Sequence, residues 1–171
     1  MRKIQKIISG GQTGVDRGAL DAAIKLGIPH GGWCPKGRKA EDGRIPDQYQ
    51  LTEMATADYP SRTRRNIQEA DGTLILSPRP LTGGTLLTWN AAEKLGKTRF
   101  CIYFPTERTL LSWLAGAELP VAVLQACGWM LGHQVQILNV AGPRESKCRG
   151  VQVFAQAVLT ELLGRVEKES V

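Results

Sequence analysis

The chain has 171 residues, of which 42% are hydrophobic and 22% charged, and its formal net charge is +6. These values are ordinary for a soluble globular protein and predict a single ligand-binding domain over residues 1–171. The positive charge favours an anionic partner, but the basic residues form no long run, which argues against a nucleic-acid platform. The longest apolar stretch, LPVAVLQACGWML, is too short to span a bilayer, so we expect no membrane association.

The four cysteines, at positions 34, 101, 127 and 148, form no CxxC pair and match no zinc motif. No secretory signal pattern precedes the first apolar run. We therefore expect a cytoplasmic protein with reduced thiols and no metal site.

The first part of the chain begins with an apolar run, KIQKIIS, which predicts a buried strand at 3–9. Apolar residues at helical spacing predict a helix at 14–27, closed by Gly27, and IPHGGWC predicts a short strand at 28–34. The segment that follows, 35–60, is polar and broken by Pro and Gly. A loop of this length inside a compact domain is often functional, and a disordered surface insertion is the alternative.

The alternation continues to the end of the chain. In chain order we expect a helix at 61–72 with Ser61 as its cap and Gly72 past its end, a strand at 73–77, a helix at 85–97, a strand at 98–104, one or two helices within 106–131, a strand at 134–140 and an amphipathic helix at 151–168. Apolar strands that alternate with helices predict an α/β fold. We expect a Rossmann-like three-layer sandwich with a mainly parallel sheet of about five strands.

Three of the turns between a strand and the next helix have unusual compositions. They are SGGQTGVDR at 9–17, PLTGGT at 80–85 and NVAGPRES at 139–146. The carboxyl ends of parallel strands share one edge of the sheet, and such folds bind ligands there, at a switch in strand order. We therefore expect the three turns to meet at one ligand site.

The first turn suits a phosphate, because glycines let backbone N–H groups approach a ligand and the following helix presents the positive end of its dipole. Its candidate binding residues are Gly10, Gly11, Gln12, Thr13, Gly14, Asp16 and Arg17. The GGxxG spacing is neither the dinucleotide fingerprint nor a Walker A loop. The alternative is a purely structural turn, in which Thr13 and Asp16 form a capping box.

The other two turns add further candidates. The second turn contributes Thr82, Gly83, Gly84 and Thr85, and the third contributes Gly142, Arg144, Glu145 and Ser146. The planar guanidinium of Arg144 suits bidentate phosphate or carboxylate binding, unless Glu145 is its ion-pair partner. Thr85 and Ser146 either contact the ligand or cap a helix. We expect the loop at 35–47, with Lys36 and Arg38, to close over the ligand.

The segments IISGGQTGVDRGALDAA, IPHGGWCPKGRKAEDGRIPDQY, DGTLILS, PLTGGT and LNVAGPRES, in this order, resemble the molybdenum-cofactor carrier family. This family is similar to a circularly permuted branch of the SLOG superfamily, which also contains the lysine-decarboxylase-like (LOG) proteins. The resemblance covers most of the chain. It implies a Rossmann-like sheet, a nucleotide- or pterin-type ligand and frequent homo-oligomers.

LOG-type enzymes follow their glycine loop with a GT-x-E-E pattern, whereas Thr85 is followed here by Leu86, Leu87 and Thr88. The missing acidic pair disfavours an N-glycosidase, because cleavage needs a carboxylate near the sugar. Asp16, Glu41, Asp42 and Glu145 are the possible substitutes.

We therefore expect a binding or carrier protein whose ligand is the molybdenum cofactor or another phosphorylated, nucleotide-like molecule with a flat ring. Arg17 and Arg144 would supply positive charge. The alternatives are a nucleotide-processing hydrolase and a nucleotide-sensing regulatory protein. We expect the partners to be a small anionic molecule and further copies of the chain, with no nucleic acid and no membrane.

Overall fold

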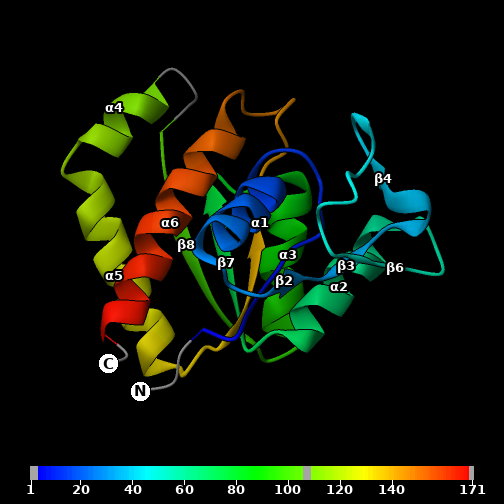
Figure 1. Ribbon diagram of the computed structural model, residues 1–171, viewed down its shortest axis with the longest axis horizontal. Helices are drawn as coiled ribbons and strands as arrows, with labels where there is room; N and C mark the ends of the chain where they lie inside the picture. The colour runs from blue at the N-terminus through cyan, green and yellow to red at the C-terminus, as the bar shows by residue number, and fades with distance from the viewer. Residues whose placement is uncertain (1–3, 106–108, 170–171) are drawn as a thin grey trace.

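The computed structural model describes residues 4–105 and 109–169; residues 3 and 106–108, which fall within two of the expected elements, lie outside this part. Its main sheet has five parallel strands in the order β2-β1-β9-β7-β8 (Figure 1). The strands are β1 (Lys6–Ile8), β2 (His30–Gly31), β7 (Gly72–Ser77), β8 (Thr98–Tyr103) and β9 (Ile137–Ala141). The predicted α/β class and the parallel sheet of about five strands are confirmed.

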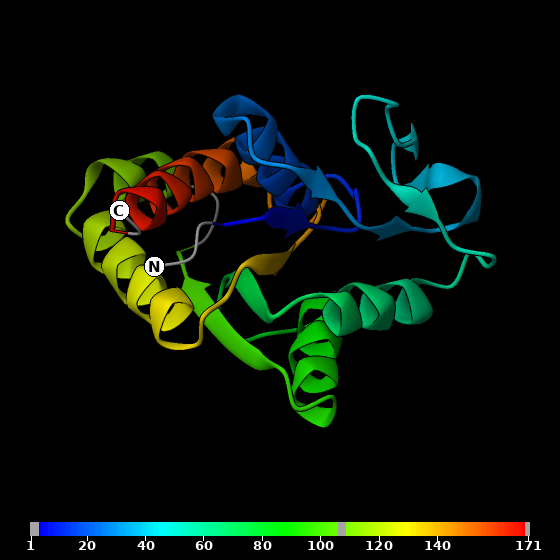
Figure 2. The ribbon, with the colours of Figure 1, turned by 60° about the horizontal axis from the view of Figure 1, so that its bottom comes forward.

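Helices cover both faces of this sheet. They are α1 (Val15–Leu26), α2 (Tyr59–Glu69), α3 (Gly83–Lys94), α4 (Leu110–Ala115), α5 (Glu118–Gly132) and α6 (Val151–Glu169). Helices α1 and α6 pack on one face, with α4 and α5 beside α6, whereas α2 and α3 lie on the other face (Figure 2). The predicted three-layer sandwich is therefore confirmed.

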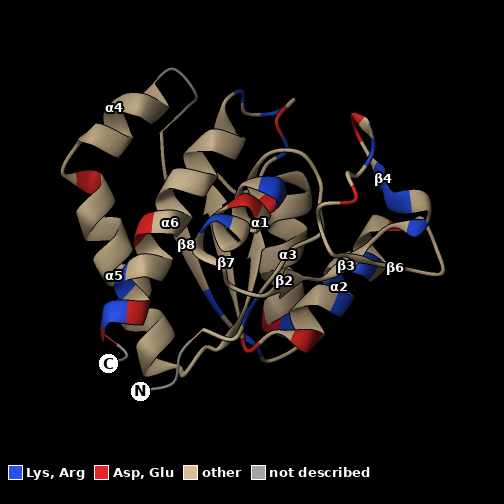
Figure 3. Cartoon of the chain, in the orientation of Figure 1, with Lys and Arg blue, Asp and Glu red and all other residues tan. Residues whose placement is uncertain are grey.

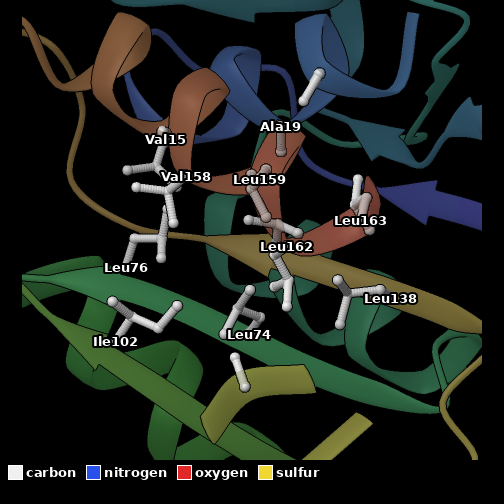
Figure 4. Close-up of a cluster of buried hydrophobic side chains, with 14 of the residues drawn as sticks. Val15, Ala19, Leu74, Leu76, Ile102, Leu138, Val158, Leu159, Leu162 and Leu163 are labelled. Carbon is white, nitrogen blue, oxygen red and sulfur yellow. The ribbon is translucent and has the colours of Figure 1, made fainter. Parts of the chain in front are cut away.

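The core lies between the sheet and the α1–α6 face (Figure 4). Apolar residues recur every three or four positions along α6, and this stripe packs against α1 and the strands. Val158 and Leu162 of α6, together with Leu74 and Leu138 of the strands, have no exposed surface. Truncating one of these leucines to alanine costs about 2–5 kcal/mol in other proteins, so this packing stabilises the edge on which the site is built.

The expected strand at 28–34 is two short strands. Gly32 has φ +124, and a Cβ atom there would lie 2.3 Å from the carbonyl oxygen of Ser9, so the chain turns away from the main sheet at this residue. The following strand, β3 (Trp33–Cys34), pairs with β6 (Thr52–Glu53).

Helix α2 starts earlier than the sequence indicated. Its N-cap is Asp58, whose carboxylate accepts a hydrogen bond of 2.8 Å from the backbone N–H of Ser61, so Ser61 is not the cap. Gly72 does not follow the helix directly, because it is the first residue of β7. The segment at 106–131 holds two helices within its described part, α4 and α5.

Residues 35–53, which we call the small lobe, are ordered and not a disordered insertion. They contain the 3₁₀ turn η1 (Lys36–Arg38) and the short strands β4 (Lys39–Ala40), β5 (Gly43–Arg44) and β6 (Figure 1). Ile45 and Tyr49 of the lobe are buried in a second apolar cluster with Leu20 of α1. The lobe is therefore attached to the sandwich by a small core of its own.

Candidate functional site

A pocket of about 670 Å³ opens at the carboxyl edge of the sheet, where β1, β9 and β7 end. The chain leaves β1 for α1 on one face and leaves β7 for α3 on the other, so the pocket lies at a switch in connection, the usual ligand position in such sheets. Its volume is within the range of small-molecule sites. The three turns converge here as expected.

The pocket takes residues from each of the three turns. Of the residues that the sequence indicated, those that line it are Gly10, Gln12, Asp16, Thr82, Gly83, Gly84, Thr85, Gly142 and Arg144. Those that do not line it are Gly11, Thr13, Gly14, Arg17, Lys36, Arg38, Glu145 and Ser146.

Sequence reasoning missed the wall that α2 forms. Tyr59, Pro60, Arg62, Thr63 and Asn66 line the pocket from this helix. A helix that leads into a parallel strand must begin at the carboxyl edge, so the topology alone could have placed the first turns of α2 at this rim. The other residues that were missed are Leu87, Thr88, Asn139, Val140, Ala141, Pro143 and Lys147.

The first turn of α3 faces open space in the pocket. Gly83 has φ +51, which favours glycine, and a Cβ atom at Gly83 or Gly84 would have no neighbour within 4 Å. Thr82 is the N-cap residue, but its side chain makes no capping hydrogen bond. This helix end can therefore present backbone N–H groups and the positive end of its dipole to an anion.

A buried ion pair lies in the pocket between α1 and α2. Nη1 of Arg62 is 3.2 Å from Oδ2 of Asp16, and the same oxygen accepts a hydrogen bond of 3.3 Å from the backbone N–H of Gln12. The side chains of Arg62 and Asp16 are only 12% and 8% exposed. Burial raises the pKa of the Asp16 carboxyl, and the charge of Arg62 opposes this rise without cancelling it.

Arg17 and Gly11 have structural roles, which corrects their expected place at the ligand. Arg17 donates two hydrogen bonds, of 2.6 and 2.8 Å, to Asp42 and a third of 3.1 Å to the carbonyl of Gly11. The hydrogen bonds from Arg17 lower the pKa of Asp42. A Cβ atom at Gly11 would lie 2.4 Å from Cδ1 of Leu51, so this glycine faces the small lobe.

Glu41 connects the small lobe to the first and third turns. Its carboxylate accepts hydrogen bonds from the hydroxyl of Thr13 and from the backbone N–H of Ser146, the latter at 3.1 Å. Burial alone would raise the pKa of Glu41, but its hydrogen bonds with Ser146 and Thr13 outweigh burial and lower it. The N-cap residue of α1 is Gly14, which has no side chain to cap the helix, so the predicted capping box of Thr13 and Asp16 is not formed.

The third turn is not held by the ion pair between Arg144 and Glu145 that the sequence analysis considered. Glu145 accepts hydrogen bonds from the backbone N–H groups of Gly150 and Gln152 and so binds the start of α6. Arg144 is instead 3.6 Å from Glu41, with a side chain 44% exposed. Basic and acidic residues lie side by side here and in the small lobe (Figure 3). Arg144 and Lys147 are thus the cations at the mouth of the pocket.

Lys36 and Arg38 do not reach the pocket. Lys36 is exposed, whereas Arg38 is buried and donates hydrogen bonds to main-chain carbonyls of the small lobe. Its acceptors are the carbonyls of Ile45 (3.1 Å), Pro46 (2.9 Å), Tyr49 (2.8 Å) and Leu51 (3.3 Å). Arg38 is therefore the centre around which the small lobe folds.

Fold and pocket together define a Rossmann-like α/β protein with a small-molecule pocket at the carboxyl edge of its sheet. The chain belongs to the circularly permutated YpsA SLOG family, whose model matches residues 7–163. It is 44% identical to the “Putative molybdenum carrier protein” of Syntrophus aciditrophicus SB, whose crystal structure superposes with a TM-score of 0.84 over 94% of this chain and 95% of that one. The family resemblance is confirmed. No curated protein sequence matches the chain.

Across the described ranges, 4–105 and 109–169, no helix combines the length and the apolar character that crossing a membrane requires.

Proposed function

We propose that the protein binds and carries a phosphorylated flat-ring ligand, of the molybdenum-cofactor type, in the pocket at the carboxyl edge of the sheet. The observation that carries this proposal is the meeting of the open first turn of α3 with the side chains of Arg62, Arg144 and Lys147 in one pocket. A helix N-terminus beside basic groups suits a phosphate. The name of the similar structure supports this ligand class.

The pocket also has surfaces that fit a flat ring. Tyr59, Pro60 and Leu87 contribute apolar surface to its walls. Such walls bind the faces of planar rings, while a few polar groups set the orientation. The residues fit the proposed group: α3 would hold its phosphate, and the apolar walls would hold its ring.

A nucleotide-processing hydrolase is the second candidate, and Asp16 is the observation that favours it. Asp16 is a carboxylate in the pocket whose pKa is raised by burial, a property common among catalytic acids and bases. It would replace the acidic pair that is missing after Thr85. Turnover of nucleoside monophosphates, measured as release of the base, separates this candidate from the carrier.

We also propose that the chain acts as a cytoplasmic homo-oligomer. Val121 and Leu124, which are 55% and 53% exposed, share one side of α5 and offer apolar surface for such a contact. Light scattering after gel filtration tests this proposal, and a monomeric mass at every concentration contradicts it.

Native mass spectrometry of protein purified from its own host tests the carrier directly, by weighing the ligand that stays bound. Calorimetric titration of the ligand-free protein with a pterin phosphate and with AMP then ranks the two ligand classes.

Gly84→Glu places a negative side chain at the start of α3 and should abolish binding. Gly164→Glu is its matched control, because this glycine of α6 lies outside the pocket and also has no neighbour near its Cβ position. Equal binding by both variants would place the phosphate elsewhere.

A further inference from the structure

Arg62 differs from the other two basic residues of the pocket in its burial. Arg144 and Lys147 are exposed at the mouth, whereas the Arg62 side chain is 12% exposed. Water screens a buried charge less, so Arg62 attracts an anion more strongly than the exposed cations do. Within the described part of the pocket lining, Asp16 is the one carboxylate that balances it.

The contact between Arg62 and Asp16 leaves much of the guanidinium unused. It is a single hydrogen bond of 3.2 Å, whereas Arg17 holds Asp42 by two bonds of 2.6 and 2.8 Å. The Nε–H of Arg62 is buried and has no acceptor among the described residues. An acidic group with several oxygens can make the forked contact that Asp16 does not make.

We propose that Arg62 is the residue that binds the acidic group of the ligand, and that the ligand takes Arg62 from Asp16, which then takes up a proton from solvent. This inference rests on the proposed function, because it requires an anionic ligand in the pocket.

The surroundings of Asp16 explain why it should take up a proton when the anion binds. Once Arg62 turns to the ligand, the buried carboxylate keeps the hydrogen bond from the backbone N–H of Gln12, but it has no charged partner. The nearest basic residue of its own helix, Arg17, is bound to Asp42. An ionised carboxylate left beside a bound anion is costly, because burial and like charge both favour its protonated form.

The other charged and titratable groups that line the pocket do not replace Arg62. Arg144 lies 3.6 Å from Glu41 at the mouth, and Lys147 is exposed beside it. The phenol of Tyr59, on α2, carries no positive charge. The charge of Asp16 is therefore neutralised by a proton, and each anion that binds is accompanied by the uptake of up to one proton.

Anion binding and protonation of Asp16 are linked, so each favours the other. If the bound anion raises the proton affinity of Asp16 by some factor, protonation of Asp16 raises the affinity for the anion by the same factor. Affinity is therefore highest below the pKa of Asp16 in the free protein. It falls by up to about tenfold per pH unit as the pH rises from that value to the pKa in the complex.

Inorganic sulfate is a suitable probe, because it keeps its double negative charge from pH 5 to pH 9. The titration curve of the Asp16 carboxyl is measured by its carbon-13 chemical shift, in sulfate and in chloride at matched ionic strength. We expect sulfate to raise the pKa of Asp16 by about one unit and to bind more weakly as the pH rises. This measurement uses the wild-type chain, so it stands even if a variant is unstable.

Asp16→Asn keeps the shape of the side chain and is neutral at every pH, so its sulfate affinity should not change with pH. Asp21→Asn is the matched control and should keep the wild-type pH dependence, because Asp21 is an aspartate of the same helix that accepts hydrogen bonds from Tyr49 and Gln152 and does not line the pocket. Sulfate binding with no change in the Asp16 titration overturns this inference and leaves the proposed function standing. An absence of sulfate binding at the pocket residues counts against both.

Discussion

The guanidinium of Arg62 lies directly against the backbone of Gly10. A Cβ atom at residue 10 would be 1.3 Å from Nη1 of Arg62, so this contact is possible only with glycine. Sequence analysis assigned Gly10 to the approach of a ligand to the backbone. In the fold, this glycine of the first turn makes room for an arginine from α2.

Gly10→Ala should therefore weaken ligand binding without unfolding the protein. The added methyl group must displace the guanidinium of Arg62 from its place in the pocket, and losing its charge-assisted contact with the ligand costs about tenfold in affinity. Calorimetry with the preferred ligand, beside thermal melting, measures both effects. Gly128→Ala, where a Cβ atom meets nothing, is the control. Wild-type affinity in a folded Gly10→Ala protein would contradict the role of this glycine.

Substitutions of Arg144 and Glu145 should have different effects, the first on ligand affinity and the second on the stability of the protein. Arg144 is half-exposed at the mouth, so Arg144→Ala should weaken binding by roughly threefold to tenfold and barely change the melting temperature. Glu145→Ala removes the acceptor for two backbone N–H groups at the start of α6 and should cost about 1 kcal/mol of stability. Its affinity should stay unchanged. Equal effects of both variants on stability would restore the pairing of Arg144 with Glu145.

Arg38 should be essential to the small lobe although it does not line the pocket. Arg38→Ala leaves several buried carbonyls without a donor, which should cost on the order of 3 kcal/mol or more. Hydrogen exchange should show lost protection at 35–53, and Lys36→Ala, at an exposed neighbour, should show none. Full protection in Arg38→Ala would mean that the apolar cluster alone holds the lobe.

Acid should loosen the small lobe before it unfolds the sandwich. The pKa values of Glu41 and Asp42 are both lowered in the folded protein. Their contribution to stability is therefore present above their ordinary pKa values and is lost as the pH falls through the folded values, below about pH 4. Limited proteolysis at falling pH should cut within 35–53 first.

The variant Glu41→Gln with Asp42→Asn should be cut there already at neutral pH. Glu53→Gln is the comparison, because it removes a carboxylate of the same lobe that accepts a hydrogen bond from the exposed backbone N–H of Gly37. Simultaneous cleavage throughout the chain would show that these two carboxylates do not control the lobe.

The parts of the site that the sequence could predict are those that follow from topology. The apolar run at Leu74–Leu76 could only be a buried strand, and parallel strands share an edge. Gly84 and Arg144, which follow two different strands, could therefore be placed at one rim from the sequence.

The Asp16–Arg62 pair could not be predicted in the same way. Tyr59, Arg62 and Asn66 share one side of α2, but Ile67 is the one apolar residue of this helix that is buried, so the sequence carries almost no signal for the side that faces the sheet. The structural role of Arg38, which we expected in a loop over the ligand, could not be predicted for a related reason. Its partners are main-chain carbonyls, which no pattern of side chains reveals.

The turns after β1 and β9 touch through their backbones. A Cβ atom at Gly14 would lie 2.4 Å from the carbonyl oxygen of Pro143, and one at Gly142 would lie 2.4 Å from that of Leu76. Because these turns pack so closely, we expect this wall of the pocket to move as one unit. Exchange of a bound molecule with solvent then depends on the opposite wall, and we expect motion of residues 78–84 to set its dissociation rate.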